Sequence, residues 1–273
     1  MNINVGFLVS YDYEYLKSSL PLIYEDSSSI TLAIDINRKT WSGSTFNIDD
    51  SFFEWLKEVD LDNKISIYED DFYKRELSSI ENDTRERKLL ANKMGEGWII
   101  QIDSDEFFLN FNGFCKYLKK HEYLLNGNKK IQIAAYWITI FKKLNDGVLY
   151  IENTEKFYLA TNTNSYRIAR NCKVQTIRVP FLVVHYSWAR SEEELNQKIS
   201  NWGHNKDFDI DKYVNFWKNI NKTNYKEFSN IHPFIKNAWK KLNYCEGKTI
   251  DEVIKNLNHK DISVSKSNLI INN

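Results

Sequence analysis

Three carboxylates follow directly after a short apolar segment of this chain. Residues 97–102 read Gly-Trp-Ile-Ile-Gln-Ile, and Asp103, Ser104, Asp105 and Glu106 come next. In an extended chain, side chains two residues apart point to the same side, about 6–7 Å apart at ~3.3 Å per residue. Asp103 and Asp105 are therefore expected to face one way, where their charges repel unless a positive group lies near them. Mg²⁺ or Mn²⁺ is the usual such group, and at the end of a buried strand it can hold the phosphates of a nucleotide.

The same residues also have a purely structural interpretation. Ser104 or Asp105 suits the N-cap of a helix that starts at Glu106, and Asp-x-Asp triplets occur by chance in many proteins. The position after an apolar strand favours a site, but this segment alone leaves both interpretations open.

A second candidate segment begins at His185, after an apolar strand predicted over residues 174–184. A histidine there can lie beside the carboxylates as a neighbour in the sheet, although a single histidine is more often a hydrogen-bonded core residue. Residues 191–194 then show the capping-box pattern of a helix start. The predicted helix ends in Asn-Trp-Gly-His at 201–204, an ending that also suits an ordinary helix C-terminus.

Alternating strands and helices must position these residues. Apolar strands are predicted over residues 5–10, 29–35 and 98–102 with helices between them, which is the pattern of a parallel α/β sheet. The Asp-Gly pair at 146–147 predicts a hairpin between two later apolar segments. Beyond residue 190 the chain is predicted to be mostly helical.

Composition bounds the class of protein. The 273 residues are 42% hydrophobic and 15% aromatic, which is enough for a large core. Lys plus Arg and Asp plus Glu both total 37, and this zero net charge argues against a nucleic-acid partner. The three widely spaced cysteines form no CxxC pair, which predicts reduced core thiols. No signal peptide or membrane span is predicted, so we expect a cytoplasmic protein with at most peripheral contact at the inner face of a membrane.

Together, the two segments resemble bacterial glycosyltransferases of the GT-A fold, the family 2-like group. In these proteins a strand ends in Asp-x-Asp-Glu-Phe, matched here by residues 103–107. Further along the chain a His-Tyr-Ser-Trp segment, matched by residues 185–188, precedes an acidic helix that ends in Asn-Trp-Gly-His, matched by residues 201–204. The Asp-x-Asp element is common, and the later block is the more specific match. With the N-terminal strand–helix–strand unit, the resemblance covers about residues 4–206.

The resemblance implies the fold class and its division into two parts. Residues 1–190 are expected to form an α/β domain of GT-A type, with a mostly parallel central sheet flanked by helices, that binds the nucleotide-sugar and carries catalysis. Residues 191–273 are expected to form a helical C-terminal extension packed on that domain.

The resemblance also implies roles for single residues. The metal ligands for Mn²⁺ or Mg²⁺ would be Asp103, Asp105 and His185. The nucleotide-sugar contacts would be Asp35, Arg85, Asp103 and Ser104, although a place on the surface of a helix is the favoured interpretation of Arg85. The metal would bridge the diphosphate and stabilise the negative charge that builds on it as the sugar leaves.

The implied activity is transfer of a sugar from a nucleotide-sugar, with a UDP-sugar as the expected donor, to a glycan or lipid-linked acceptor in cell-surface polysaccharide synthesis. An inverting mechanism, which we favour over a retaining one, needs a carboxylate base. Glu155, after the predicted hairpin, and Glu106 are the candidates. Two other classes stay open: a nucleotidyltransferase, disfavoured by the lack of a glycine-rich loop after the first strand, and a non-catalytic carbohydrate-binding module whose carboxylates only cap a helix. The oligomeric state is not predicted.

Overall fold

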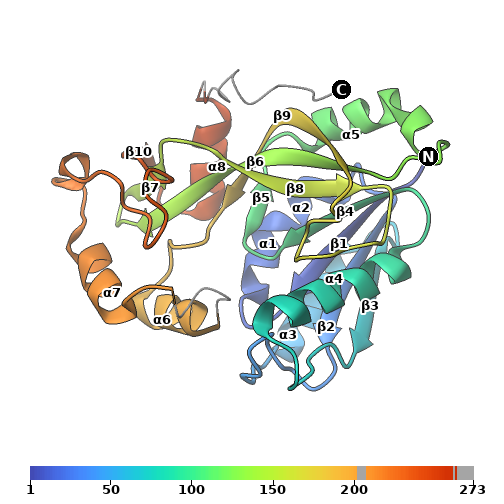
Figure 1. Ribbon diagram of the computed structural model, residues 1–273, viewed down its shortest axis with the longest axis horizontal. Coiled ribbons are helices and arrows are strands. Elements are labelled where there is room, and N and C mark those ends of the chain that lie inside the picture. The colour runs from blue at the N-terminus through green and yellow to red at the C-terminus, as the bar shows by residue number, and fades with distance from the viewer. Residues whose placement is uncertain (202–206, 261, 263–273) are drawn as a thin grey trace.

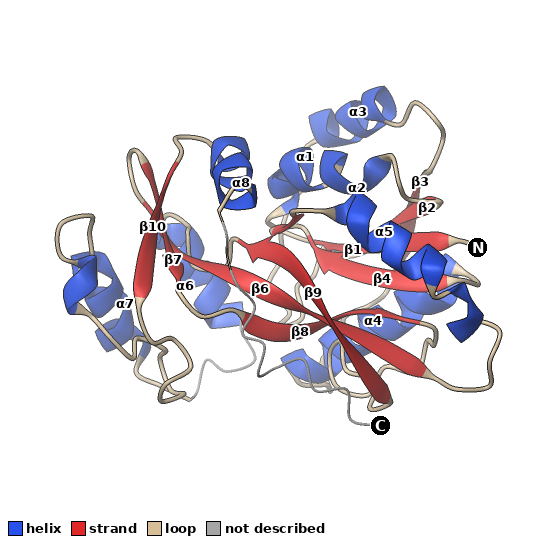
Figure 2. Cartoon of the chain, turned by 90° about the horizontal axis from the view of Figure 1, so that it is seen from above, coloured by secondary structure: helices blue, strands red, loops and turns tan. Residues whose placement is uncertain are grey.

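The computed structural model describes residues 1–201, 207–260 and 262. Within these residues, a large mixed sheet is flanked by helices, which confirms the predicted α/β class (Figure 1). Figure 2 shows the parallel strands between helix α5 on one side and helix α4 on the other. None of the helices in the described part of the chain is both long and apolar enough to cross a membrane.

Four parallel strands form the first half of the sheet. Their order is β3 (Ile65–Asp70), β2 (Ser29–Asp35), β1 (Ile3–Val9) and β4 (Trp98–Asp103). Strands β1, β2 and β4 are buried on both faces, which explains why each reads as a continuous apolar segment rather than an alternating one. Their carboxyl ends meet at one edge, where Leu8 of β1 lies opposite Asp103 of β4.

Two layers of helices cover these strands. Apolar side chains of α1 (Leu16–Ser19), α2 (Pro21–Tyr24), α3 (Asp50–Val59) and α5 (Phe111–Lys120) pack on one face. On the other face lies α4 (Ser79–Met94), so close to β1 that a Cβ atom on Gly6 would come within 2.8 Å of the side chains of both Leu90 and Met94. A glycine at this point of β1 therefore lets α4 settle against the sheet.

Strands of mixed direction extend the sheet. The described order continues from β4 through β8 (Glu155–Thr161), β6 (Ile131–Lys143) and β7 (Gly147–Ile151) to β10 (Leu242–Glu246). The antiparallel pair β6–β7 confirms the hairpin predicted at the Asp-Gly pair. Strand β9 (Gln175–His185) runs parallel to β6 and also pairs with a short strand, β5 (Glu106–Phe108).

Strand β5 corrects one interpretation of the carboxylate segment. A helix starting at Glu106, capped by Ser104 or Asp105, is wrong, because residues 106–108 pair with β9 as a strand. The nearby helix α5 begins only at Phe111, and its N-cap is Asn110, whose side chain accepts a hydrogen bond from the backbone of Gly113. The pairing with β9 decides the structure of this segment.

The C-terminal part contains helices α6 (Glu192–Asn201), α7 (Ile210–Asn219) and α8 (Ile250–Asn258). Short 3₁₀ turns occur at Tyr13–Tyr15, Glu122–Leu124 and Tyr225–Glu227. The predicted capping box is present, since the Ser191 hydroxyl and the Glu194 carboxylate each accept a hydrogen bond from the other residue's backbone. The C-terminal part also contributes strand β10 to the sheet, whereas the sequence predicted mostly helices there. Residues 202–206, with most of the Asn-Trp-Gly-His ending, lie outside the described residues, and the division at residue 190 stays a prediction.

An aromatic-rich core joins the C-terminal part to the distal end of the sheet. Phe141 and Leu149 of the β6–β7 hairpin pack in one buried cluster with Trp188, Trp217 and other C-terminal side chains. The Nζ atom of Lys142 donates hydrogen bonds of 2.7, 2.8 and 2.6 Å to the backbone carbonyls of Trp217, Lys218 and Ile220 at the end of α7. The last carbonyls of a helix have few backbone partners, and of these three, within the described residues, only that of Trp217 also accepts a 3.3 Å hydrogen bond, from Ile220; Lys142 therefore caps the C-terminus of α7.

Substituting Lys142 with methionine should lower the free energy of unfolding by about 2 kcal/mol, because three carbonyl groups lose a charged donor while the aliphatic contact is kept. Urea denaturation followed by tryptophan fluorescence measures the change. Lys143→Met, at the exposed neighbouring position, is the matched control and should leave stability within about 0.5 kcal/mol of the parent. Equal stability of the two variants would show that the cap contributes nothing.

Candidate active site

The carboxylate segment lies at the edge where the parallel strands end. Asp103 is the last residue of β4, Asp105 lies in the following turn, and Glu106 is the first residue of β5. Because Glu106 pairs with His185 in β9, the histidine comes to the same place, and its Nε2 atom lies 3.7 Å from Oδ1 of Asp105. The proximity of Asp103, Asp105 and His185 expected from the sequence is therefore present. Their roles toward a metal stay predictions.

Two arginines hold Asp103. Nη2 of Arg87, on α4, lies 2.9 Å from Oδ1, and Nη2 of Arg170 lies 2.8 Å from Oδ2. Burial alone would raise the pKa of Asp103, but the two guanidinium groups outweigh it and lower the pKa to about 2. Asp103 thus stays ionised, with 28% of its side chain exposed at the edge of the sheet.

The ion pairs continue on both sides of Asp103. Nε of Arg87 donates a 2.6 Å hydrogen bond to Asp83, one turn earlier in α4. Arg170 also donates a 2.8 Å hydrogen bond to Oε2 of Glu106, an atom that the backbone N–H of Asp103 contacts at 3.0 Å. Burial is the main reason that the pKa of Glu106 rises to about 7. Its other oxygen, Oε1, is buried without a hydrogen-bond partner among the described residues.

Asp105 has a different set of partners. Its Oδ2 atom accepts hydrogen bonds from Nη2 of Arg190 at 2.5 Å and from Nζ of Lys198 at 2.8 Å. The same Nη2 of Arg190 reaches Asp12, just after β1, at 3.0 Å. Burial opposes ionisation of Asp105, yet Lys198, His185 and Arg190 hold its pKa well below the usual range. Arg190 therefore links the turn after β1 to Asp105, and Lys198 links the last turn of α6 to the same carboxylate.

His185 is a neutral imidazole at neutral pH. Burial is the largest cause that lowers its pKa to about 4, and its ring packs against that of Trp137 with 4.6 Å between centroids. A neutral imidazole offers the nitrogen lone pair that a metal ligand needs. The 3.7 Å between Nε2 and Oδ1 of Asp105 is too long for a hydrogen bond.

Two of these side chains offer donor atoms of the kind that a divalent cation binds. Oδ1 of Asp105 and Nε2 of His185 lie 3.7 Å apart, whereas both oxygens of Asp103 are engaged by guanidinium groups. In the part of the chain that the structure describes, no three His, Cys, Asp or Glu side chains are placed to hold a metal ion together. A cation held by Asp105 and His185 therefore stays a prediction, and it would need further ligands from water or a bound molecule.

Asp35 and Arg85, two residues expected to contact the nucleotide, form hydrogen bonds with the backbone of the loops after β2 and β3. The carboxylate of Asp35 accepts four backbone hydrogen bonds of 2.9–3.0 Å, from residues 37 and 39 and from residues 72 and 73. Nη1 of Arg85 donates 2.7 Å hydrogen bonds to the carbonyls of Asp71 and Phe72. Both side chains join these two loops to each other or to α4, and any contact with a nucleotide stays a prediction.

Ser104 positions the turn between Asp103 and Asp105. Its hydroxyl donates a 3.3 Å hydrogen bond to the carbonyl of Leu8 in β1, and its own carbonyl accepts a 3.0 Å hydrogen bond from Ser19. The side chain is 1% exposed. Ser104 therefore acts on the geometry of its two neighbours.

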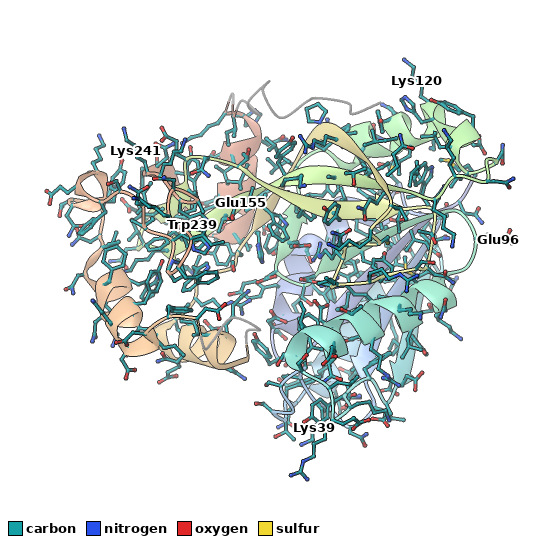
Figure 3. All side chains as sticks on the ribbon, in the orientation of Figure 1. Lys39, Glu96, Lys120, Glu155, Trp239 and Lys241 are labelled. Carbon is teal, nitrogen blue, oxygen red and sulfur yellow. The ribbon has the colours of Figure 1, made fainter. Side chains whose placement is uncertain are left out.

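Glu155 lies on the same face of the sheet as His185. It is the first residue of β8, after the hairpin as predicted, and its Oε2 atom accepts a 2.7 Å hydrogen bond from Thr139 of β6. Thr139 lies opposite His185 in β9, and paired residues on adjacent strands share a face. Burial raises the pKa of Glu155. Figure 3 shows Glu155 and Trp239 close together, where the sheet meets the C-terminal part.

Sequence reasoning missed the basic side chains of this site. Arg190 stands in the segment that follows His185, and Lys198 lies about one helical turn after the capping box, but neither position carries a spacing rule. Nothing in the sequence around Arg87 or Arg170 marks either residue. The pairing of a charge with a buried carboxylate depends on contacts between distant parts of the chain.

Arg170→Met should lower the free energy of unfolding by about 3–5 kcal/mol, because it leaves Glu106 and one oxygen of Asp103 buried without a counter-charge. Adding Glu106→Gln to that variant should cost less than Glu106→Gln alone, with a coupling of about 1–3 kcal/mol in a double-mutant cycle. Guanidinium denaturation of the four proteins gives this number. Arg167→Met, at an exposed position nearby, is the control, and additive effects would contradict the pairing.

Comparisons with known proteins give only distant likenesses. No protein-family model and no curated protein matches the chain. Among solved structures, S. aureus TarS 1-349 is similar at 10% identity with a TM-score of 0.30, over 50% of this chain and 36% of that one. HddC from Yersinia pseudotuberculosis, solved in complex with GMP-PN, is similar at 8% identity with a TM-score of 0.32, over 68% of this chain and 91% of that one. Likenesses at this level do not assign a family.

Proposed function

We propose that this protein is a glycosyltransferase that uses a nucleotide-sugar donor, with a UDP-sugar first among the candidates. One observation carries the proposal. A carboxylate, a neutral histidine and two cations converge at the carboxyl edge of parallel strands, through Asp105, His185, Arg190 and Lys198. Open α/β sheets bind ligands at this edge, and this set of groups suits a diphosphate with a cation. The acceptor in the proposal is a glycan or a lipid-linked sugar.

The charge balance beside Asp105 is compatible with a cationic ligand. The ion pairs of the site form two clusters among the described residues. Asp83, Asp103 and Glu106 pair with Arg87 and Arg170, whereas Asp12 and Asp105 pair with Arg190 and Lys198. In the second cluster two acidic side chains balance two basic ones, so a divalent cation held there would leave a positive charge. Such a site attracts a diphosphate.

A Mn²⁺ or Mg²⁺ ion would be held by Asp105 and His185, where it would supply positive charge to the diphosphate oxygens. Asp103 keeps its two arginines and faces solvent with part of its side chain. A carboxylate fixed in this way accepts hydrogen bonds from hydroxyl groups, so we assign Asp103 to the ribose of the donor.

Glu155 is our choice for the base of an inverting transfer. Its Oε2 atom accepts a hydrogen bond from Thr139, and burial raises the pKa of Glu155, which makes its carboxylate a stronger base. The acceptor oxygen would form the bond to the anomeric carbon, its proton would go to Glu155, and the electrons of the broken bond would remain on the diphosphate. Glu106 is the poorer base, because it is 1% exposed and lies under Arg170.

The two other classes gain no support from the structure. The non-catalytic module assumed that the carboxylates cap a helix, and β5 stands where that helix was expected. The nucleotidyltransferase would use a glycine-rich loop after β1, and residues 10–13 contain no glycine.

Asp105→Asn should weaken binding of UDP in the presence of Mn²⁺ by at least about tenfold, because it removes the carboxylate that would hold the cation together with His185. Isothermal calorimetry measures the affinity, and circular dichroism checks that the variant is folded. Asp62→Asn, at an exposed position with the same chemical change, should bind like the parent. Parental affinity in a folded Asp105→Asn protein would remove Asp105 from the site.

Glu155→Gln should lower kcat by about 10²–10⁴ without changing the affinity for UDP, because only proton removal from the acceptor is lost. The assay follows acceptor-dependent release of UDP from a UDP-sugar. The base acts as a carboxylate, so the activity of the parent protein should increase as pH rises through the raised pKa of Glu155. The glutamine variant should lose this acidic limb of the pH profile. Glu152→Gln, exposed and nearby, is the control. A parental kcat for Glu155→Gln would place the base elsewhere.

A further inference from the structure

We propose that Lys198 recognises the diphosphate of the donor by exchanging its ion pair with Asp105 for one with the phosphates. This inference rests on the proposed function and assigns a role in donor binding to a residue of α6 that no sequence motif marks. It follows from how the cations are distributed over the two oxygens of one buried carboxylate.

The two oxygens of Asp105 differ in the number of positively charged side chains that contact them. Oδ2 accepts hydrogen bonds from both Arg190 and Lys198, at 2.5 and 2.8 Å. Oδ1 faces only the neutral ring of His185, at 3.7 Å. A single carboxylate charge therefore balances two cations on one side, of which Arg190 also has Asp12 at 3.0 Å. One of the two cations can leave without stranding Asp105 as an unpaired buried charge, which would be strongly destabilising.

Of the two cations, Arg190 is the fixed one. Its side chain is 1% exposed and also donates a 3.2 Å hydrogen bond to the carbonyl of Ser187. The guanidinium group lies over the rings of Tyr11 and Tyr15, at 5.9 and 5.2 Å from their centroids. These contacts hold Arg190 on Asp105.

Lys198 has the freedom that Arg190 lacks. Its side chain is 22% exposed, and within the described residues Asp105 is the one carboxylate with which it pairs. Its neighbours on α6, Leu195 and Ile199, are at most 1% exposed and anchor the helix in the core. A fixed helix thus presents a flexible four-carbon side chain with a compact charge, a form suited to phosphate recognition.

A diphosphate placed beside Asp105 carries more negative charge than the carboxylate, so Lys198 gains by moving to it. Asp105 keeps Arg190 and frees part of Oδ2. In the transfer itself, the bond between the anomeric carbon and the phosphate oxygen breaks and its electron pair stays on the diphosphate. Lys198 would stabilise this charge electrostatically.

Calorimetric titration of the full chain with UDP, uridine and inorganic pyrophosphate tests the proposal, both with EDTA and with Mn²⁺. Lys198→Met should weaken UDP and pyrophosphate binding by about tenfold or more and leave uridine binding unchanged. Lys198→Arg should restore most of the loss. Lys218→Met is the matched control, because Lys218 of α7 forms an ion pair with Glu192 of α6, the helix that carries Lys198. This variant should bind all three ligands like the parent.

The outcomes separate this inference from the proposed function. Parental UDP and pyrophosphate affinity in Lys198→Met would overturn the role of Lys198 and leave the glycosyltransferase proposal standing. An equal loss for uridine and UDP would show a structural role and also overturn it. Pyrophosphate binding that depends on Lys198, in a protein that cleaves no nucleotide-sugar, would support the anion site and refute the glycosyltransferase. A parent protein that binds neither UDP nor pyrophosphate refutes both.

Discussion

The burial of several carboxylates at one edge of a sheet constrains the rest of this structure. Asp103, Asp105 and Glu106 follow an apolar strand so closely that they enter the protein with it, and ionised groups in such a place need counter-charges. The four cations come from α4, from the loop before β9, from the segment after β9 and from α6. Each ion pair therefore ties a distant part of the chain to the strand ends.

This constraint also separates positioning from chemistry among the polar residues. Arg87 and Arg170 keep Asp103 ionised and hold its side chain in place, while Ser104 fixes the turn through hydrogen bonds with the backbone. Oδ1 of Asp105 and Nε2 of His185 lie 3.7 Å apart. The ion pairs of Asp103 and these two donor atoms lie close together at the ends of β4, β5 and β9, so fixed ion pairs surround the atoms that can contact a ligand.

Much of the fold and part of the site could be predicted from the sequence. The parallel strands appear as apolar segments because they are buried on both faces, and the meeting of Asp105 with His185 follows from two strands that end in polar residues. Strand β5 was missed because three residues carry too little pattern to outweigh a helix cap, and its pairing partners in β9 lie 75 to 79 residues further along the chain. The partners Arg190 and Lys198, 85 and 93 residues from Asp105, lie equally far beyond any local signal. The resemblance implied nucleotide contacts for Asp35 and Arg85, but hydrogen bonds to the loops after β2 and β3 decide where these side chains lie.

Strand β6 links the two halves of the molecule through one continuous backbone. Residues 131–139 pair with β8 and β9, where Trp137 lies opposite Glu155 and Thr139 lies opposite His185. Residues 140–143 pair with β7, with a register irregularity between Ile140 and Lys142, and this end of the strand reaches the aromatic core of the C-terminal part. No loop separates these regions along the strand. A change in the packing of α7 would therefore reach Glu155 by two routes, through the strand that carries Thr139 and through Trp239 of the C-terminal part, which lies beside Glu155 (Figure 3). Inserted residues in the loops after α7 would alter the surroundings of Glu155, whereas the ion pairs of Asp103 with Arg87 and Arg170 involve no residue of the C-terminal part.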